Sequence, residues 1–114
     1  MEKQEDFDLG RLSEISTILK ALSHPSRLRI VEALGEKSYC VCELTALVGS
    51  DTSTVSKHLS ILKSAGILTD TKKKNQVFYA LRSRCVLDSI AHLMPLLEEK
   101  LKHYSEIMER QPAT

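Results

Sequence analysis

The chain has 114 residues, of which 42% are hydrophobic and 27% charged, and its formal net charge is +1. This composition excludes a disordered chain and predicts one domain over residues 1–114, with a modest core that would gain from oligomerisation. The polar N-terminus excludes a signal peptide, and no apolar run is long enough to span a membrane. Because the three cysteines are odd in number, we expect free thiols and a cytoplasmic protein.

The charges are distributed unevenly along the chain. Between Asp51 and Arg84 there are seven cations against two anions, whereas the ends are acidic, including an N-terminal arm over residues 1–10. A local basic patch of this kind is the electrostatic footprint of nucleic-acid binding.

The first two helices are predicted on either side of 23-SHP-25. Apolar residues at steps of three and four give the first helix its stripe, which begins at Leu12. Pro25 is tolerated as an opening residue of the second helix, over 25–35, which ends at Gly35.

Two more helices follow, and both have clear ends. The third is predicted over 41–48 and is closed by Gly49. The fourth is predicted over 52–66, with Ser50 or Asp51 as its N-cap.

The apolar period changes after this helix. Segments 67–69 and 77–81 are short and rich in β-branched or aromatic residues, and 70-DTKKKNQ-76 between them is polar. We therefore predict a β-hairpin whose loop, 70–76, forms a lysine-rich tip.

The segment 83–110 is predicted to be helical, with Pro95 kinking or splitting the helix. Its apolar residues follow a strict heptad seam, and so narrow a seam favours a partner helix and hence a homodimer. The residues predicted at the dimer interface are Leu12, Ile15 and Leu19 in the first helix and Leu87, Ile90, Met94, Leu97, Leu101 and Tyr104 in the last.

The order of these elements predicts a mainly α fold with a β-hairpin wing, a winged helix-turn-helix that binds double-stranded DNA. Alone, the serines of the fourth helix fit a solvated surface and the lysine run fits a solubilising turn, but in this order they favour DNA. If each subunit of a dimer places about three lysines on phosphates, the log–log salt slope should be roughly −5. The predicted DNA-binding residues are Ser53, Ser56, Lys57, His58, Ser60, Lys63, Lys72, Lys73 and Lys74.

Three segments resemble the ArsR/SmtB family of metal-responsive repressors: 20-KALSHPSRLRIVEAL-34, 42-CELTALVGSDTSTVSKHLSILKSAGIL-68 and 77-VFYAL-81. The resemblance covers most of the chain. It implies a homodimer joined by its first and last helices, which binds operator DNA without a cofactor and is released by an inducer. The chain is then a transcriptional repressor and not an enzyme.

A cysteine pair suggests the inducer. The stretch 40-CVCELT-45 resembles the C-V-C-[DE]-L-C motif of the arsenic-responsive branch, but Thr45 stands in place of the third cysteine. Soft ions select sulfur ligands, so arsenite, antimonite or another soft metal ion is expected at Cys40 and Cys42. A third sulfur could come from Cys85 of either subunit.

The spacing of the pair leaves other interpretations open. Residues i and i+2 do not share a helix face, so a ligand on Cys40 and Cys42 should distort the start of the third helix. The spacing alone favours small buried side chains, and a thiol redox or persulfide sensor is the main alternative. A thiol oxidoreductase lacks its βαβ pattern and nucleophile–base set here, and a constitutive DNA-binding protein stays open.

The histidines give a weaker metal signal. His92, His103 and Glu106 reproduce the spacing of the zinc-responsive branch, but an isoleucine holds its Asp position, so we interpret the match as coincidence. His24 at a helix junction is expected to be a structural hydrogen-bonding residue. For His58, packing or a phosphate contact is expected.

Overall fold

The computed structural model describes residues 2–110 and the side chains of residues 8–110. The chain forms two compact units, Met1–Arg84 and Cys85–Thr114. The first contains α1 (Glu2–Leu22), α2 (Pro25–Leu34), β1 (Tyr39–Cys40), α3 (Val41–Val48), α4 (Thr52–Ser64), β2 (Leu68–Lys73) and β3 (Gln76–Leu81), and the second contains α5 (Cys85–Ala91) and α6 (Met94–Arg110).

Local signals fix the ends of the helices in the first unit. His24, in an extended conformation, caps α2 because its Nδ1 accepts a hydrogen bond of 3.0 Å from the Ser26 N–H. Asp51 caps α4 in the same way, its Oδ1 accepting from the Thr54 N–H at 2.7 Å. Gly49 ends α3 with a φ of 78°, a conformation that favours glycine. The structural role predicted for His24 is confirmed, and residues 2–10 of the predicted arm belong to α1.

The core of this unit lies where α2, α3 and α4 meet the base of the hairpin. Full burial of aliphatic side chains on these elements supplies the main favourable term in folding. The side chains with no exposed surface are Ile30, Val31, Leu44, Val55, Leu59, Leu62 and Leu68.

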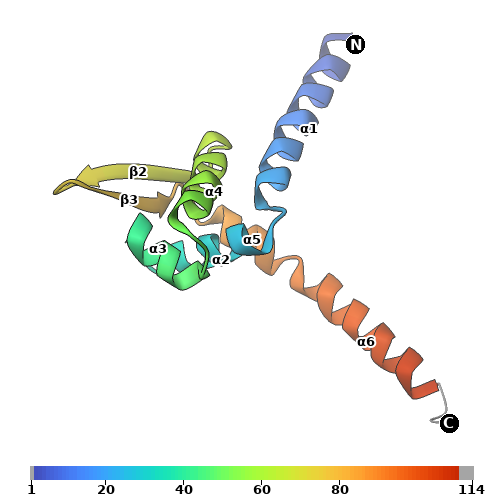
Figure 1. Ribbon diagram of the computed structural model, residues 1–114. Coiled ribbons are helices and arrows are strands. Elements are labelled where there is room, and N and C mark those ends of the chain that lie inside the picture. The colour runs from blue at the N-terminus through green and yellow to red at the C-terminus, as the bar shows by residue number, and fades with distance from the viewer. Residues whose placement is uncertain (1, 111–114) are drawn as a thin grey trace. The chain divides into compact units, whose positions relative to one another are not determined.

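The hairpin is longer than predicted. Strands β2 and β3 pair in antiparallel register from Leu68 opposite Leu81 to Lys73 opposite Gln76. The predicted loop over 70–76 is therefore wrong, because all but two of the polar residues of this stretch pair as strand. The turn is Lys74–Asn75, and both residues have positive φ (51° and 66°), as a two-residue type I′ turn requires. Figure 1 shows this hairpin as an extended ribbon beside α3 and α4.

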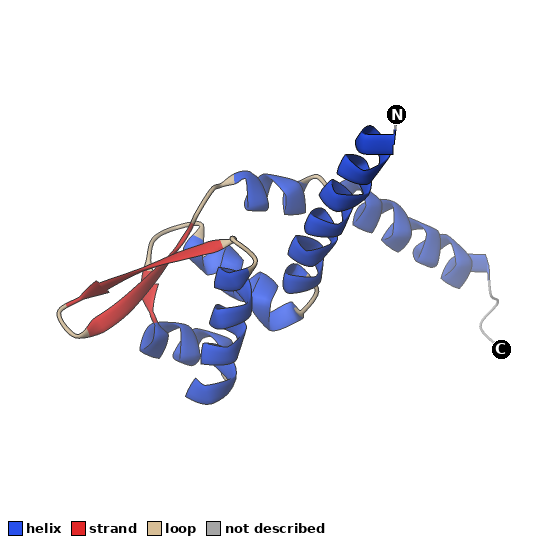
Figure 2. Cartoon of the chain, turned by 90° about the horizontal axis from the view of Figure 1, so that it is seen from above, coloured by secondary structure: helices blue, strands red, loops and turns tan. Residues whose placement is uncertain are grey.

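A third strand was not predicted. The two residues of β1 pair with β3, Tyr39 opposite Tyr79 and Cys40 opposite Phe78, so the sheet order is β1-β3-β2. Figure 2 shows that α3 begins directly after this short strand. The wing and the first helix of the helix-turn-helix are thus joined through Cys40.

In the second unit, α5 ends at Ala91 and α6 begins at Met94. Pro95 is the second residue of α6. The N–H groups of the first turn have no partner within a helix, so a proline there costs no hydrogen bond. The predicted interruption at Pro95 is confirmed as a split. In the part of the chain that the structure describes, no helix is long and apolar enough to cross a membrane.

Candidate functional site

Helix α4 has one buried and one exposed face, as predicted. The side chains of Val55, Leu59 and Leu62 have no exposed surface and hold the helix against the core. Five predicted DNA-binding residues are exposed on this helix, and small hydroxyls among them allow close approach to a major groove. They are Ser53, Ser56, Lys57, Ser60 and Lys63.

His58 corrects one prediction for this face. Its side chain is only 7% exposed, and its ring lies 4.5 Å from that of His24, measured between centroids. Its Nδ1 accepts a 3.1 Å hydrogen bond from Arg27 Nε. Burial, with additional effects of His24 and Arg27, lowers the pKa of His58 and so favours the neutral ring. This placement contradicts the DNA contact predicted for His58 and agrees with the packing alternative.

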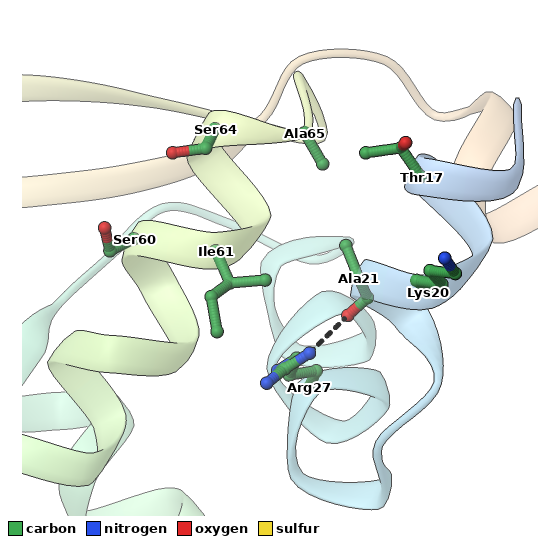
Figure 3. Close-up of a pocket in the computed structure, with 8 residues that line it drawn as sticks. All are labelled: Thr17, Lys20, Ala21, Arg27, Ser60, Ile61, Ser64 and Ala65. Carbon is green, nitrogen blue, oxygen red and sulfur yellow. Dashed lines mark hydrogen bonds between the residues drawn. The ribbon is translucent and has the colours of Figure 1, made fainter. Parts of the chain in front are cut away.

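Arg27 connects three helices. Besides its bond to α4, its Nη1 donates to the carbonyl oxygen of Ala21 at the end of α1, at 3.4 Å (Figure 3). Arg27 and Ala21 both line a hollow of about 360 Å³ between α1 and α4. The guanidinium therefore holds the recognition helix α4 to α2 and to the end of α1, a role that sequence reasoning missed. The hollow is lined by Thr17, Lys20, Ala21, Arg27, Ser60, Ile61, Ser64 and Ala65.

The wing presents the predicted lysines. Lys72 and Lys73 lie on β2 and Lys74 lies in the turn, and all three are exposed. By contrast, Lys63 on α4 donates to Asp70 Oδ2 on β2 at 2.8 Å. This hydrogen bond raises the pKa of Lys63. One predicted DNA-binding cation is therefore already paired with a carboxylate.

The cysteine pair lies where the wing meets α3. Cys40 is 7% exposed and is both the last residue of β1 and the N-cap of α3, with extended φ and ψ (−84°, 168°). Its N–H donates to Glu43 Oε1 at 3.1 Å, which lowers the pKa of Glu43. Cys42, in the first turn of α3, is exposed. Two helical residues at i and i+2 point to different faces of the helix. Cys40 is extended and only Cys42 is helical, so this restriction does not apply to the pair.

Both cysteines line one cavity of about 210 Å³. Its remaining walls come from Val41 and from three wing residues, Asn75, Gln76 and Val77. Sequence reasoning predicted the two thiols but missed the wing residues, because their approach depends on the pairing of β1 with β3.

No third metal ligand joins this pair within the described residues. Among the side chains of residues 8–110, no group of three or more His, Cys, Asp or Glu is placed to hold a metal ion, and that includes His92, His103 and Glu106. Cys85 begins α5 in the other unit and is exposed. Cys40 and Cys42 are thus the two cysteines that the first unit brings to one cavity.

Comparison with known proteins decides the family. The model of bacterial regulatory proteins of the arsR family matches residues 24–70. The chain is 38% identical over 78 residues to the biofilm growth-associated repressor of Xylella fastidiosa, covering 68% of each chain. It is 32% identical over 95 residues to a cadmium resistance transcriptional regulatory protein CadC homolog of Staphylococcus aureus, covering 82% of this chain and 73% of that one. The chain belongs to the ArsR family of bacterial regulatory proteins.

The fold of this ArsR-family repressor is also that of solved relatives. A homodimeric winged helix-turn-helix DNA-binding domain from Mycobacterium bovis superposes with a TM-score of 0.78 at 25% identity, covering 90% of this chain and 95% of that domain. The predicted family, fold class and DNA-binding repressor function are confirmed, as is the prediction that the protein is not an enzyme.

Proposed function

We propose that this ArsR-family repressor is a homodimer that binds operator DNA through α4 and the wing and is released when Cys40 and Cys42 bind arsenite, antimonite or another soft metal ion. The observation that carries this proposal is the double position of Cys40. It ends β1, which is paired to the wing, and it caps α3, which leads into the recognition helix.

Support for the DNA interface comes from exposure and charge. The three lysines of the wing and Lys57 of α4 are exposed and can reach phosphates, while the serines on the exposed face of α4 can approach base edges. In a dimer these contacts are doubled, which gives the strong salt dependence expected for operator binding.

Support for the dimer comes from apolar surface that the single chain leaves exposed. The predicted seam residues on α1 and α6 are more than two fifths exposed, whereas Leu87 and Ile90 on α5 are partly buried. Exposed apolar stripes along single helices, here on α1 and on α6, favour association. The exposed seam residues are Leu12, Ile15, Leu19, Met94, Leu97, Leu101 and Tyr104.

The release step follows from the contacts of Cys40. A soft ion bonded to both sulfurs would draw the buried Cys40 side chain and the exposed Cys42 side chain together. The 3.1 Å hydrogen bond between the Cys40 N–H and Glu43 then comes under strain, and the first turn of α3 shifts. Because only the residues Gly49–Asp51 separate α3 from α4, the recognition helix moves with it. A coupling of about 1–3 kcal/mol between the two sites is typical of such regulation.

Replacing both thiols tests the inducer. In a Cys40→Ser/Cys42→Ser double variant, arsenite should no longer release fluorescently labelled operator DNA, because neither hydroxyl forms a stable bond to a soft ion. Fluorescence anisotropy during titration with arsenite, antimonite, cadmium, lead and zinc measures the release. If a Cys85→Ser variant still releases DNA on addition of arsenite, the site consists of two thiols. If the release is lost, Cys85 is the third ligand. Release that persists in the double variant excludes the proposed site.

A thiol redox or persulfide switch is the second candidate. Two observations favour it. Cys40 and Cys42 are both reduced and line one cavity, and no group of three metal-ligating side chains is found among the described residues. Oxidation of the pair would close a small, strained ring, and strained disulfides are the labile ones. Peroxide or polysulfide would then release the DNA while metal ions have no effect.

An Asp70→Asn variant tests the DNA interface itself. We expect it to bind operator several-fold more tightly, because Lys63 is freed for a phosphate and an anion is removed from the DNA side. The log–log salt slope should become more negative by about one for each subunit. Anisotropy titrations at several salt concentrations measure both quantities. Asp8→Asn on α1 makes the same charge change as a control, and equal slopes for the two variants would contradict the assignment of Lys63.

A further inference from the structure

We propose that the turn of the wing closes the cysteine site, so that Asn75 and Gln76 contact the third substituent of a ligand held by Cys40 and Cys42. This inference rests on the proposed function and extends it, because it gives the wing a direct part in ligand recognition.

The register of the sheet brings these residues together. Cys40 is paired with Phe78, so the chain continues into α3 alongside the residues that precede Phe78 on β3. These are Val77 and Gln76, with Asn75 next in the turn, and all three line the cavity that contains both cysteines. The positive φ of Asn75 (66°) is set by the two-residue turn, which fixes where its side chain starts.

The chemistry of trivalent arsenic leaves one position for the wing. Arsenous acid, As(OH)3, reacts with two thiols to give a dithiolate As–OH and two molecules of water. Two As–S bonds form and two As–O bonds break, each thiol proton leaves with a hydroxide as water, and no oxidant or reductant is needed. The product keeps one hydroxyl, because the cavity offers no third thiol.

The walls of the cavity match that product. A carboxamide can both donate to and accept from a hydroxyl, so Asn75 and Gln76 can bond the remaining As–OH group. Val41 and Val77 supply apolar walls beside the two sulfurs. The ligand therefore acts on the wing directly as well as through α3, and the same turn contains Lys74, one of the predicted DNA-binding lysines.

The test uses two wing variants, Gln76→Ala and Asn75→Gly, and glycine is chosen at position 75 because it tolerates the positive φ there. The control is Thr71→Ala, on β2 and outside the cavity. Mass spectrometry of the intact protein with arsenite measures adduct formation, and anisotropy measures the arsenite concentration that releases half of the operator. We expect all variants to form the adduct, and the two wing variants to need at least about tenfold more arsenite, a change within the usual range of coupling. Thr71→Ala should respond as the wild type does.

Methylarsenite provides a second comparison, because its third substituent is a methyl group that accepts no hydrogen bond. Its release midpoint should be the same in the wild type and in Gln76→Ala. Unchanged arsenite midpoints in both wing variants, or equal shifts for arsenite and methylarsenite, overturn this inference and leave the proposed function standing. Absence of any adduct on Cys40 and Cys42 in the wild type overturns the proposed function as well.

Discussion

A Leu101→Glu variant is expected to be a folded monomer that binds operator DNA at least about 100-fold more weakly than the wild type. Leu101 is 58% exposed in the single chain, so the substitution leaves the core of each unit intact. In a dimer the same position would bury unpaired carboxylates in an apolar seam, which costs several kcal/mol. Without the partner subunit, half of the DNA contacts are lost.

Sedimentation equilibrium measures the change in mass, and anisotropy measures the affinity for the operator. Lys102→Glu provides the matched control, because it introduces the same carboxylate at the next residue of α6, off the heptad seam. The control should remain a dimer. A Leu101→Glu protein that is still dimeric would rule out this seam as the interface.

An Arg27→Met variant should lose about 1–3 kcal/mol of unfolding free energy. Methionine keeps much of the apolar stem but leaves the buried Nδ1 of His58 without its donor and removes the bond to the Ala21 carbonyl. An unsatisfied buried acceptor loses its hydration without compensation, which is why the loss exceeds that of an average hydrogen bond. Urea denaturation at pH 7.5, followed by circular dichroism, gives the difference.

Arg29→Met on the same helix is the control for Arg27. Its side chain is 54% exposed, and its ion pair with Glu32 is long, at 4.0 Å. Exposed pairs of this kind contribute little, so the change should be within about 0.5 kcal/mol. Equal losses in the two variants would mean that Arg27 does not hold α4 in the way the hydrogen bonds indicate.

Helix ends were predictable because their causes are local. Gly49 can adopt a positive φ, Asp51 can cap the next helix, Pro25 is tolerated as an opening residue, and Pro95 interrupts the last helix. The bounds of α3 agree with the prediction for this reason. Each of these signals acts within a few residues of the end that it defines.

The sheet was less predictable because its stabilising contacts are distant in the sequence. Tyr39 pairs with Tyr79, forty positions further along the chain, and two residues alone carry no strand signal. The polar strand β2 is held by its ladder with β3 rather than by apolar alternation. Asn75 was the available clue to the short turn, since asparagine tolerates positive φ.

The burial of His58 could have been found from the sequence. It lies three residues after Val55 and four before Leu62, so it belongs to the apolar stripe of α4. The pairing of Lys63 with Asp70 had no such signal, because it depends on how α4 and β2 lie against each other. The wing residues of the cysteine cavity were hidden for the same reason.

The unequal burial of the two cysteines has a kinetic consequence. An electrophile that forms a single bond to sulfur meets the exposed Cys42 first, and the 7% exposed Cys40 reacts slowly with it. Such a reagent modifies one thiol and leaves the N-cap of α3 unchanged. A ligand with two reactive positions, once bonded to Cys42, is held at high effective concentration near Cys40. It can react there whenever the Cys40 thiol becomes transiently exposed. For the ligand site proposed above, this order of reaction predicts discrimination by valence: reagents that bond one sulfur are tolerated, and compounds able to bridge two sulfurs release the DNA.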